Sequence, residues 1–259
     1  MRKLLGITAL ALLASTPAVA DVTLTGTSSM KGGPFSAEGA ATTYIKGTKM
    51  RTDATFRGDL TSTIFDIDAQ KMIVINHKKK EAEEFGMATF EKSMGMIDDS
   101  SVDVKFTPTG NSKTIAGEKC DEYTMTITLP MKQEGMPEGI SILMTGPVFI
   151  AKNSPAKDEY AAFYNAAIEK GFFFTNPAQA KAQPGIAKGF ARLYKEMAKA
   201  GVAYEIMMQI KFEGGGMMGS MMNKMGGSNV TTTYTSVSSD PIPASTFEVP
   251  AGYKVKQGK

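Results

Sequence analysis

The sequence contains one cysteine, one histidine and no tryptophan among its 259 residues. A lone cysteine excludes an internal disulfide framework, and we expect Cys120 to behave as a small buried apolar residue. The lone histidine, His77, leaves no Ser/His/Asp or Cys/His arrangement of the kind used in nucleophilic catalysis, and no pair of carboxylates has a catalytic spacing. Asp66 and Asp68 flank a tight turn, where carboxylates ordinarily cap backbone amides. These absences predict a protein that is not an enzyme and carries no cofactor.

An excess of charge of one sign is also lacking, since the formal net charge is +3 at pH 7. Beyond residue 20 the only arginines are Arg51, Arg57 and Arg192, and the lysines are spread out without interleaved aromatic residues. This composition argues against a nucleic-acid partner. The chain shows no linker and no internal repeat, and one all-β or mixed domain can contain about 250 residues. We therefore expect a single domain over residues 21–259.

Residues 1–20 have the pattern of a cleavable secretory signal. Two basic residues precede an apolar run at residues 4–13, and a small-x-small tripeptide ends at Ala20. We expect cleavage between Ala20 and Asp21. The apolar run is well short of the roughly 20 residues that a membrane-spanning helix needs, and no cysteine stands at the cleavage point. The sequence therefore predicts a soluble periplasmic protein whose mature chain has no transmembrane span.

The region at residues 42–85 has the alternating pattern of β-strands. Apolar side chains recur around residues 50–56, 64–67 and 72–75, with polar breaks of a few residues between them. Breaks this short allow only a return to a neighbouring strand, so we expect an antiparallel meander. A sheet with one apolar face needs a second layer packed on that face.

Further strands are expected after the meander. Residues 203–212 and 229–238 alternate and should form a long hairpin. Its tip, residues 214–227, combines six glycines with five methionines, and we expect it to be mobile and partly exposed. The apolar stretch at residues 140–152 should be another strand, which the Gly-Pro pair at 146–147 could break.

Two amphipathic helices are expected at residues 155–170 and 185–200. Ser154 can cap the first helix and Pro155 suits its first position. Each helix carries an aromatic stripe at helical spacing, made by Tyr160, Phe163, Tyr164, Phe190 and Tyr194. The stripes fit two interpretations. They are core residues packed on the sheet or, if that packing is incomplete, one wall of a ligand site.

The sequence resembles a family of uncharacterised exported proteins defined only as a domain of unknown function, which is structurally similar to the lipoprotein carrier LolA and its relatives LolB and RseB. The segments that carry the resemblance are residues 44–51, 64–75, 115–123 and 247–253. The resemblance implies an α+β fold, a curved antiparallel half-barrel with the helical insertion at about 155–200 packed on its concave face. In the carrier an arginine on an early strand tethers the helical lid, and Arg51 is in a comparable place. Arg51 is alternatively a solvated strand charge.

Three classes of function remain open. The favoured class is noncatalytic binding of an apolar small molecule, a lipid or a lipidated protein between sheet and helices, because aromatic and methionine side chains adapt to irregular apolar shapes. No polar recognition group is evident for such a ligand. The candidate ligand contacts are Arg51, Tyr160, Phe163, Tyr164, Phe190 and Tyr194.

The second class is binding of Cu(I) or Ag(I) through the soft thioethers of the hairpin tip. The candidate ligands are Met217, Met218, Met221, Met222 and Met225. The glycines of the tip offer no fixed framework, so the same segment also fits a flexible apolar loop that touches a membrane or a partner. The third class is a purely structural or interaction module of the cell envelope.

Overall fold

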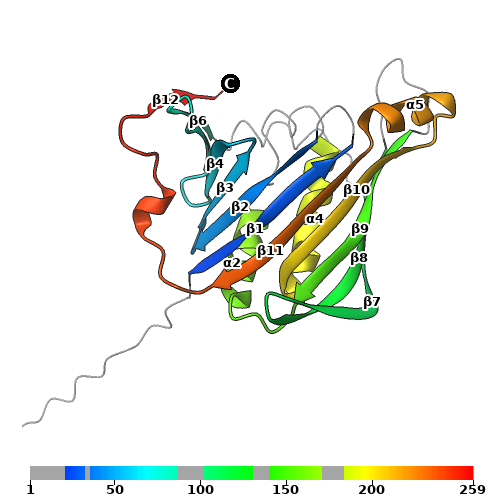
Figure 1. Cartoon of the computed structure of the whole chain (residues 1–259), viewed down its shortest axis with the longest axis horizontal. Helices are drawn as coiled ribbons and strands as arrows, with labels where there is room; N and C mark the ends of the chain where they lie inside the picture. The colour runs from blue at the N-terminus through cyan, green and yellow to red at the C-terminus, as the bar shows by residue number, and fades with distance from the viewer. Residues whose placement is uncertain (1–20, 33–35, 87–101, 131–139, 171–183, 259) are drawn as a thin grey trace, which may run out of the picture.

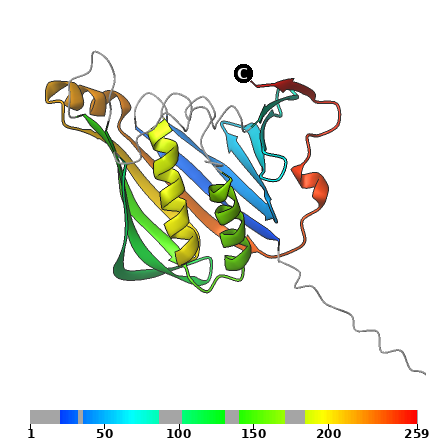
Figure 2. The ribbon, with the colours of Figure 1, turned by 180° about the vertical axis from the view of Figure 1, so that it is seen from behind.

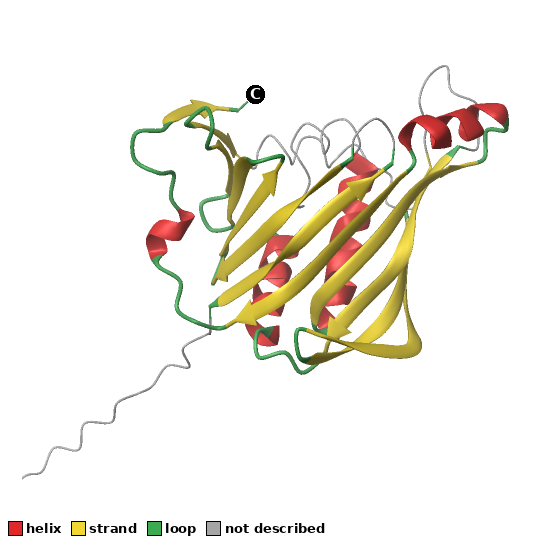
Figure 3. Cartoon of the chain, viewed as in Figure 1, coloured by secondary structure: helices red, strands yellow, loops and turns green. Residues whose placement is uncertain are grey.

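The computed structural model contains one large, open β-sheet with two of the described helices packed on one face (Figures 1 and 3). It describes residues 21–32, 36–86, 102–130, 140–170 and 184–258. The expected secretory signal at residues 1–20 lies outside these ranges. The strands are β1 Val22–Lys31, β2 Ala37–Lys46, β3 Lys49–Phe56, β4 Asp59–Asp66, β5 Lys71–Asn76, β6 Glu81–Gly86, β7 Asp103–Ile115, β8 Glu118–Pro130, β9 Ser141–Ala151, β10 Val202–Glu213, β11 Ser228–Ser238 and β12 Lys254–Gln257. The helices are α2 Lys157–Glu169, α4 Pro184–Ala200, α5 Met217–Gly226 and the short 3-10 helix η2 Ala244–Phe247.

The twelve described strands lie in the order β12-β6-β5-β4-β3-β2-β1-β11-β10-β9-β8-β7. All neighbouring pairs are antiparallel except β12 and β6, which run parallel. The expected meander is confirmed as β2 to β6. Its β3–β4 turn has positive φ at both Arg57 and Gly58, the backbone of the two-residue turn that suits a twisted hairpin.

Helices α2 and α4 lie side by side against one face of the sheet, as Figure 2 shows. Helix α4 packs on β7 to β10, whereas α2 packs on β2 and β10 and against α4. Neither helix packs on β4, β5 or β6 to an extent comparable with its packing on the strands just named. The predicted fold class, an unclosed antiparallel sheet with two amphipathic helices on its concave face, is confirmed.

The sheet has buried apolar residues on both faces. The largest group lies between α2 and the strands β1 to β3 and includes Val22, Ile45 and Phe163. A smaller group on the opposite face contains Ile64 and Ile73. The chain after β11 covers this second group, contributing its own apolar side chains from η2 and the flanking loop. This explains why β5 contains a continuous apolar run, residues 72–75, instead of a strictly alternating pattern.

Three local expectations were wrong. Helix α2 begins at Lys157, so Pro155 precedes it; Ser154 Oγ instead accepts the Ala156 N–H at 3.4 Å. Strand β9 continues through residues 146–147 without a break, because both residues keep their pairing with β8. The hairpin tip is partly exposed, as expected, but it contains the helix α5 and is not the flexible loop considered for it. The Asn223 side chain of α5 hydrogen-bonds both the N–H and the C=O of Phe212. Cys120 is fully buried, as expected, and desolvation raises the pKa of its thiol.

Candidate functional site

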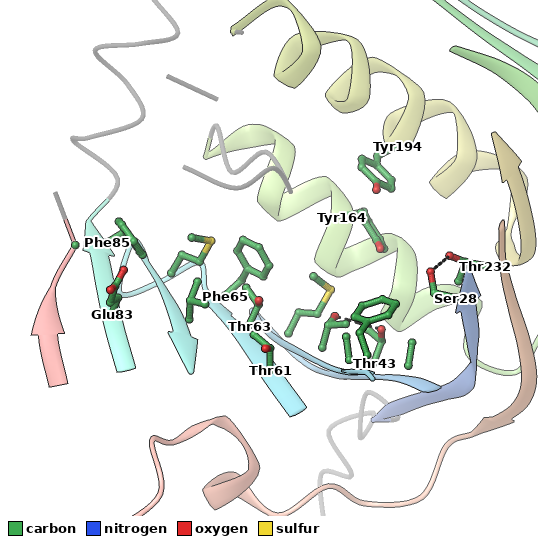
Figure 4. A pocket seen from close by; sticks show the side chains of 18 of the residues that line it. Ser28, Thr43, Thr61, Thr63, Phe65, Glu83, Phe85, Tyr164, Tyr194 and Thr232 are labelled. Atoms are coloured by element: carbon green, nitrogen blue, oxygen red, sulfur yellow. Dashed lines mark hydrogen bonds between the residues drawn. The ribbon is translucent and has the colours of Figure 1, made fainter. Parts of the chain in front are cut away.

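A cavity of about 990 Å³ lies on the concave face beside the helices (Figure 4). Strands β1 to β6 and β11 form its floor, while α2 and α4 each contribute one tyrosine to its side. It therefore occupies the part of the sheet that the helices leave least covered. Its volume lies at the upper end of the roughly 300–1,000 Å³ typical of small-molecule sites.

One row of the floor is apolar. Met50, Phe65, Met72 and Phe85 are successive cross-strand partners from β3 to β6. Since residues in register on neighbouring strands point to the same face, their side chains form a continuous apolar stripe across four strands. All four line the cavity.

The adjacent row of the floor carries hydroxyl groups. Thr43, Thr52 and Thr63 are cross-strand partners on β2, β3 and β4, two residues along each strand from the apolar row. Thr43 and Thr52 hydroxyls lie 3.2 Å apart, and at the far side Ser28 and Thr232 hydroxyls lie 3.1 Å apart. Figure 4 shows several of these groups facing the cavity. The floor therefore offers an apolar stripe with a neutral, hydrogen-bonding stripe beside it.

Three tyrosines complete the side nearest the helices. Tyr164 of α2 and Tyr194 of α4 stack with ring centroids 5.1 Å apart, and Tyr234 comes from β11. Burial raises the pKa of Tyr194 to about 12 and raises the pKa values of Tyr164 and Tyr234, the former further through its phenolic neighbours. All three phenols therefore stay neutral at physiological pH.

The end of the chain closes the opposite side of the cavity. Lys256, Gln257 and Gly258 line it, because the edge strand β12 pairs with β6. Gly258 N–H donates to the Glu84 carbonyl at 2.7 Å, and Lys256 Nζ lies 2.7 Å from a Glu81 carboxylate oxygen. Charged groups among the lining residues are confined to this side, where Glu83 and Lys256 lie.

The predicted aromatic contacts divide into two groups. Tyr164 and Tyr194 line the cavity. Tyr160 and Phe163 are instead buried in the core between α2 and the sheet, and Phe190 packs in the group beneath α4. The core interpretation thus describes the packing of these last three side chains, and their contact with a ligand stays a prediction.

Arg51 lies on the face of the sheet opposite the cavity. Its neighbours Met50 and Thr52 point into the cavity, so the alternation of the strand sends Arg51 to the other side. There its guanidinium donates to Asp53 Oδ1 at 2.6 Å and to the Thr246 carbonyl at 2.8 Å. Arg51 therefore bonds the segment after β11 and not the helical lid that the resemblance implied. With its side chain 12% exposed it is not a solvated strand charge either, and its contact with a ligand stays a prediction.

His77 belongs to the same network. Ser62, fully buried, donates to Asp53 Oδ1 at 2.6 Å and lies 2.7 Å from His77 Nε2. Because the serine proton goes to Asp53, Nε2 carries a proton and donates to Ser62, leaving Nδ1 to accept from the Tyr253 hydroxyl at 3.0 Å. The structure thus brings a serine, a histidine and an aspartate together, contrary to the sequence analysis, but with the serine hydroxyl inaccessible and directed at the carboxylate.

Helix α5 carries the methionines proposed as metal ligands. Met217, Met218 and Met221 are 88%, 40% and 50% exposed, and Met222 is partly buried. Met225 belongs to the helix, but its side chain is outside the described part. In the described ranges, no group of three or more His, Cys, Asp or Glu residues could hold a metal ion. None of the described helices is long and apolar enough to cross a membrane.

Part of the chain matches the model of a protein family whose function is unknown. Residues 24–135 match the family described as "Domain of unknown function (DUF4412)". This match confirms the resemblance to a domain of unknown function that the sequence suggested. No curated protein sequence matches the chain.

Three solved structures are similar over most of their length. An uncharacterized conserved protein from Thermus thermophilus is 7% identical, with a TM-score of 0.40 and coverage of 93% of this chain and 91% of the other. A putative outer membrane lipoprotein-sorting protein domain from Vibrio parahaemolyticus is 8% identical, with a TM-score of 0.35 and coverage of 89% and 90%. A DUF1329 family protein from Desulfovibrio piger is 10% identical, with a TM-score of 0.34 and coverage of 90% and 91%.

The threonine row was missed by the sequence analysis, although the sequence contains a signal for it. Thr43, Thr52 and Thr63 each follow the strand alternation as a polar residue on the face that Met50 and Phe65 mark as inward. Threonine at such a position looks like a solvent-facing strand residue. No comparable sequence pattern marks Lys256, Gln257 and Gly258 as lining residues, because their position depends on the pairing of β12 with β6.

Proposed function

We propose that the protein is an exported, noncatalytic carrier that binds an amphiphilic ligand with an apolar chain, a lipid or a lipidated protein, in the cavity between the sheet and its helices. The observation that carries this proposal is the pair of adjacent rows on the cavity floor, one apolar and one hydroxyl-bearing. An apolar chain would lie along Met50, Phe65 and Met72. A neutral polar group, such as an ester or amide, would bond to the threonine row.

The charge distribution supports an uncharged or weakly charged ligand. The tyrosines are neutral, and Glu83 and Lys256 lie together at the side closed by β12. Burying an unpaired ionic head group among hydroxyls would cost several kcal/mol. Export to the periplasm, expected from residues 1–20, would place this site where lipids and lipoproteins pass between membranes.

The first experiment is native mass spectrometry of the mature protein from its own cell envelope, followed by organic extraction and lipid identification. A co-purifying acyl species is expected. A bare protein that also fails to bind N-phenyl-1-naphthylamine, a neutral apolar fluorophore, would overturn the proposal and favour a structural or interaction module.

Two matched variants connect binding to this cavity. Ala54→Phe places a ring in the cavity, whereas Thr55→Phe places the same ring on the opposite face of β3. We expect Ala54→Phe to abolish fluorophore binding and Thr55→Phe to retain it. If both variants retained fluorophore binding, the ligand would lie elsewhere.

A second candidate function is Cu(I) or Ag(I) binding, and the conformation of the hairpin tip favours it. At roughly 100° per residue, the methionine positions of α5 fall on one side of the helix, while Gly219 and Asn223 on the other side pack on the β10–β11 hairpin. The helix is thus attached by its small and polar side and presents the thioethers of Met217, Met218 and Met221 outward. This supplies the framework that the glycine-rich sequence did not suggest.

The metal candidate is tested by titrating Ag(I), a redox-inert analogue of Cu(I), into protein labelled with ¹³C at its methionine methyl groups. A Cys120→Ala background removes the competing thiol. Replacing Met217, Met218, Met221 and Met222 with leucine should abolish the complex and remove the methyl signals that shift. Met30→Leu, an exposed methionine on β1, is the control. Unchanged Ag(I) binding in the fourfold variant would exclude α5.

A further inference from the structure

Glu159, in the first turn of α2, has a buried carboxylate oxygen that lacks a partner. The residue is only 3% exposed, and its Oε1 accepts the Gly47 N–H at 2.5 Å. Its Oε2 is the one buried side-chain oxygen or nitrogen of the described residues without a hydrogen bond. An unsatisfied buried polar atom costs about 1–3 kcal/mol, and more when it is charged. A hydrogen-bond donor placed at Glu159 Oε2 would remove this cost.

The first residue of the ordered sheet lies beside this carboxylate. Val22 pairs with Ile45, so Asp21 stands opposite Lys46, the residue before Gly47. Asp21 is buried, and its Oδ2 accepts from Lys46 Nζ at 2.7 Å and from Ile242 N–H at 2.5 Å. The start of β1, the β2–β3 turn and the first turn of α2 thus converge.

The local charges do not balance. Two carboxylates, Asp21 and Glu159, face a single ammonium group, Lys46, whose side chain is 41% exposed. Burial raises the pKa of Glu159; the Gly47 N–H lowers it, nearby Asp21 raises it and Lys46 lowers it. A positively charged group with N–H donors would supply the hydrogen bond that Glu159 Oε2 lacks. It would also balance the excess negative charge of the two carboxylates.

We propose that this missing group is the α-ammonium of Asp21, created when the leader is removed between Ala20 and Asp21, and that it forms an ion pair with Glu159. Hydrolysis by an export-coupled peptidase breaks the Ala20–Asp21 amide with one water molecule. The leader leaves with the new carboxylate on Ala20, and the Asp21 nitrogen becomes an ammonium. In the uncleaved chain the same nitrogen is an uncharged amide with one N–H.

The consequence is that processing completes the attachment of α2 to the sheet. Glu159 is joined to the β2–β3 turn through Gly47, and the new ion pair would add the end of β1 to the same anchor. Tyr164, further along α2, lines the cavity. Cleavage of the leader thereby fixes a helix that forms one side of the cavity.

A double-mutant cycle tests this ion pair. Four proteins are compared by thermal unfolding: chains that begin at Asp21 or carry Gly-Ser before it, each with Glu159 or with Glu159→Gln. The extension moves the α-ammonium by about 7 Å. We expect the extension to lower the Tm of the Glu159 protein and to leave that of the Gln variant nearly unchanged. Glu169→Gln, at the exposed far end of α2, is the control and should not alter the effect of the extension.

A second measurement remains informative if Glu159→Gln fails to fold. The pKa of the α-amine is determined by NMR in the chain that begins at Asp21, where Asp21, Glu159 and Lys46 are the ionisable groups that surround it. We expect a value above the usual range of about 7.7–8.0, because two carboxylates outweigh one ammonium. An ordinary or lowered pKa, an equal Tm loss in both backgrounds, or an exported protein whose first residue is not Asp21 would overturn the proposal.

Discussion

His77 Nδ1 lies 3.0 Å from the phenolic oxygen of Tyr253 and joins the end of β5 to the segment that leads into β12. The two rings also meet edge to face, with centroids 5.6 Å apart. Three residues after Tyr253, Lys256 begins the stretch that lines the cavity. The contact on one face of the sheet therefore helps to position a wall of the cavity on the other.

The Tyr253 hydroxyl should contribute measurably to stability. Tyr253→Phe removes the donor to His77 Nδ1 and should lower the free energy of unfolding by about 0.5–1.5 kcal/mol. Denaturant unfolding measures this change. Val255→Ala, on the exposed strand β12, is the control and should stay within about 0.5 kcal/mol of the parent protein.

Stability should decline in mild acid because of His77. Burial lowers the pKa of His77, and Arg51 lowers it further, while Asp53 partly offsets this. The folded state thus favours the neutral ring, so the contribution is complete above the unfolded pKa of about 6.5 and is lost as the pH falls toward the lowered pKa. Tm measured from pH 8 to pH 5 should show this loss, and His77→Asn should flatten the profile over that interval. An identical profile in the variant would contradict this assignment.

Ser62 should be the most sensitive polar position of this network. Ser62→Ala removes the group that Arg51 and His77 donate to and that itself donates to Asp53. Leaving these partners unpaired at a buried site should cost about 1–3 kcal/mol in unfolding free energy. Ser236→Ala, on the exposed part of β11, should change stability little.

The threonine row should recognise the polar part of the ligand. In the double variant Thr52→Val, Thr63→Val both hydroxyls are lost while side-chain volume is kept. We expect the affinity for a monoacylglycerol to fall by roughly tenfold, equivalent to about 1.4 kcal/mol. Binding of N-phenyl-1-naphthylamine, which uses the apolar row alone, should be unchanged. If binding of both the monoacylglycerol and the fluorophore were lost, the substitutions would have altered the cavity itself.

Phe163 should act through packing and not through ligand contact. It is fully buried between α2 and the sheet, so Phe163→Ala should lower the unfolding free energy by about 3–5 kcal/mol. Calorimetry measures the loss, and ligand affinity per folded molecule should be retained. A stable variant with no ligand affinity would support the interpretation of this residue as a ligand contact.

Much of the architecture could be predicted from local patterns. The meander β2 to β6 and the helices α2 and α4 follow from the periods of apolar residues, because each element buries one face along its own length. Helix α5 could not be predicted in this way. Glycine and methionine at residues 214–227 suit a loop as well as a helix, and the deciding contact is that of Asn223 with Phe212 on the neighbouring strand.

The sequence by itself determined which side chains lie on which face of each strand and helix, since alternation and helical spacing are properties of the local backbone. It also determined that Cys120 is a buried apolar residue. Only the tertiary structure decided that Tyr164 and Tyr194 meet a cavity while Phe163 fills the core, and that Arg51 bonds the segment after β11. It likewise brought Glu159 to Asp21 and Tyr253 to His77. These relationships join segments more than a hundred residues apart, and they depend on how the sheet curves and where the end of the chain packs, which no local pattern records.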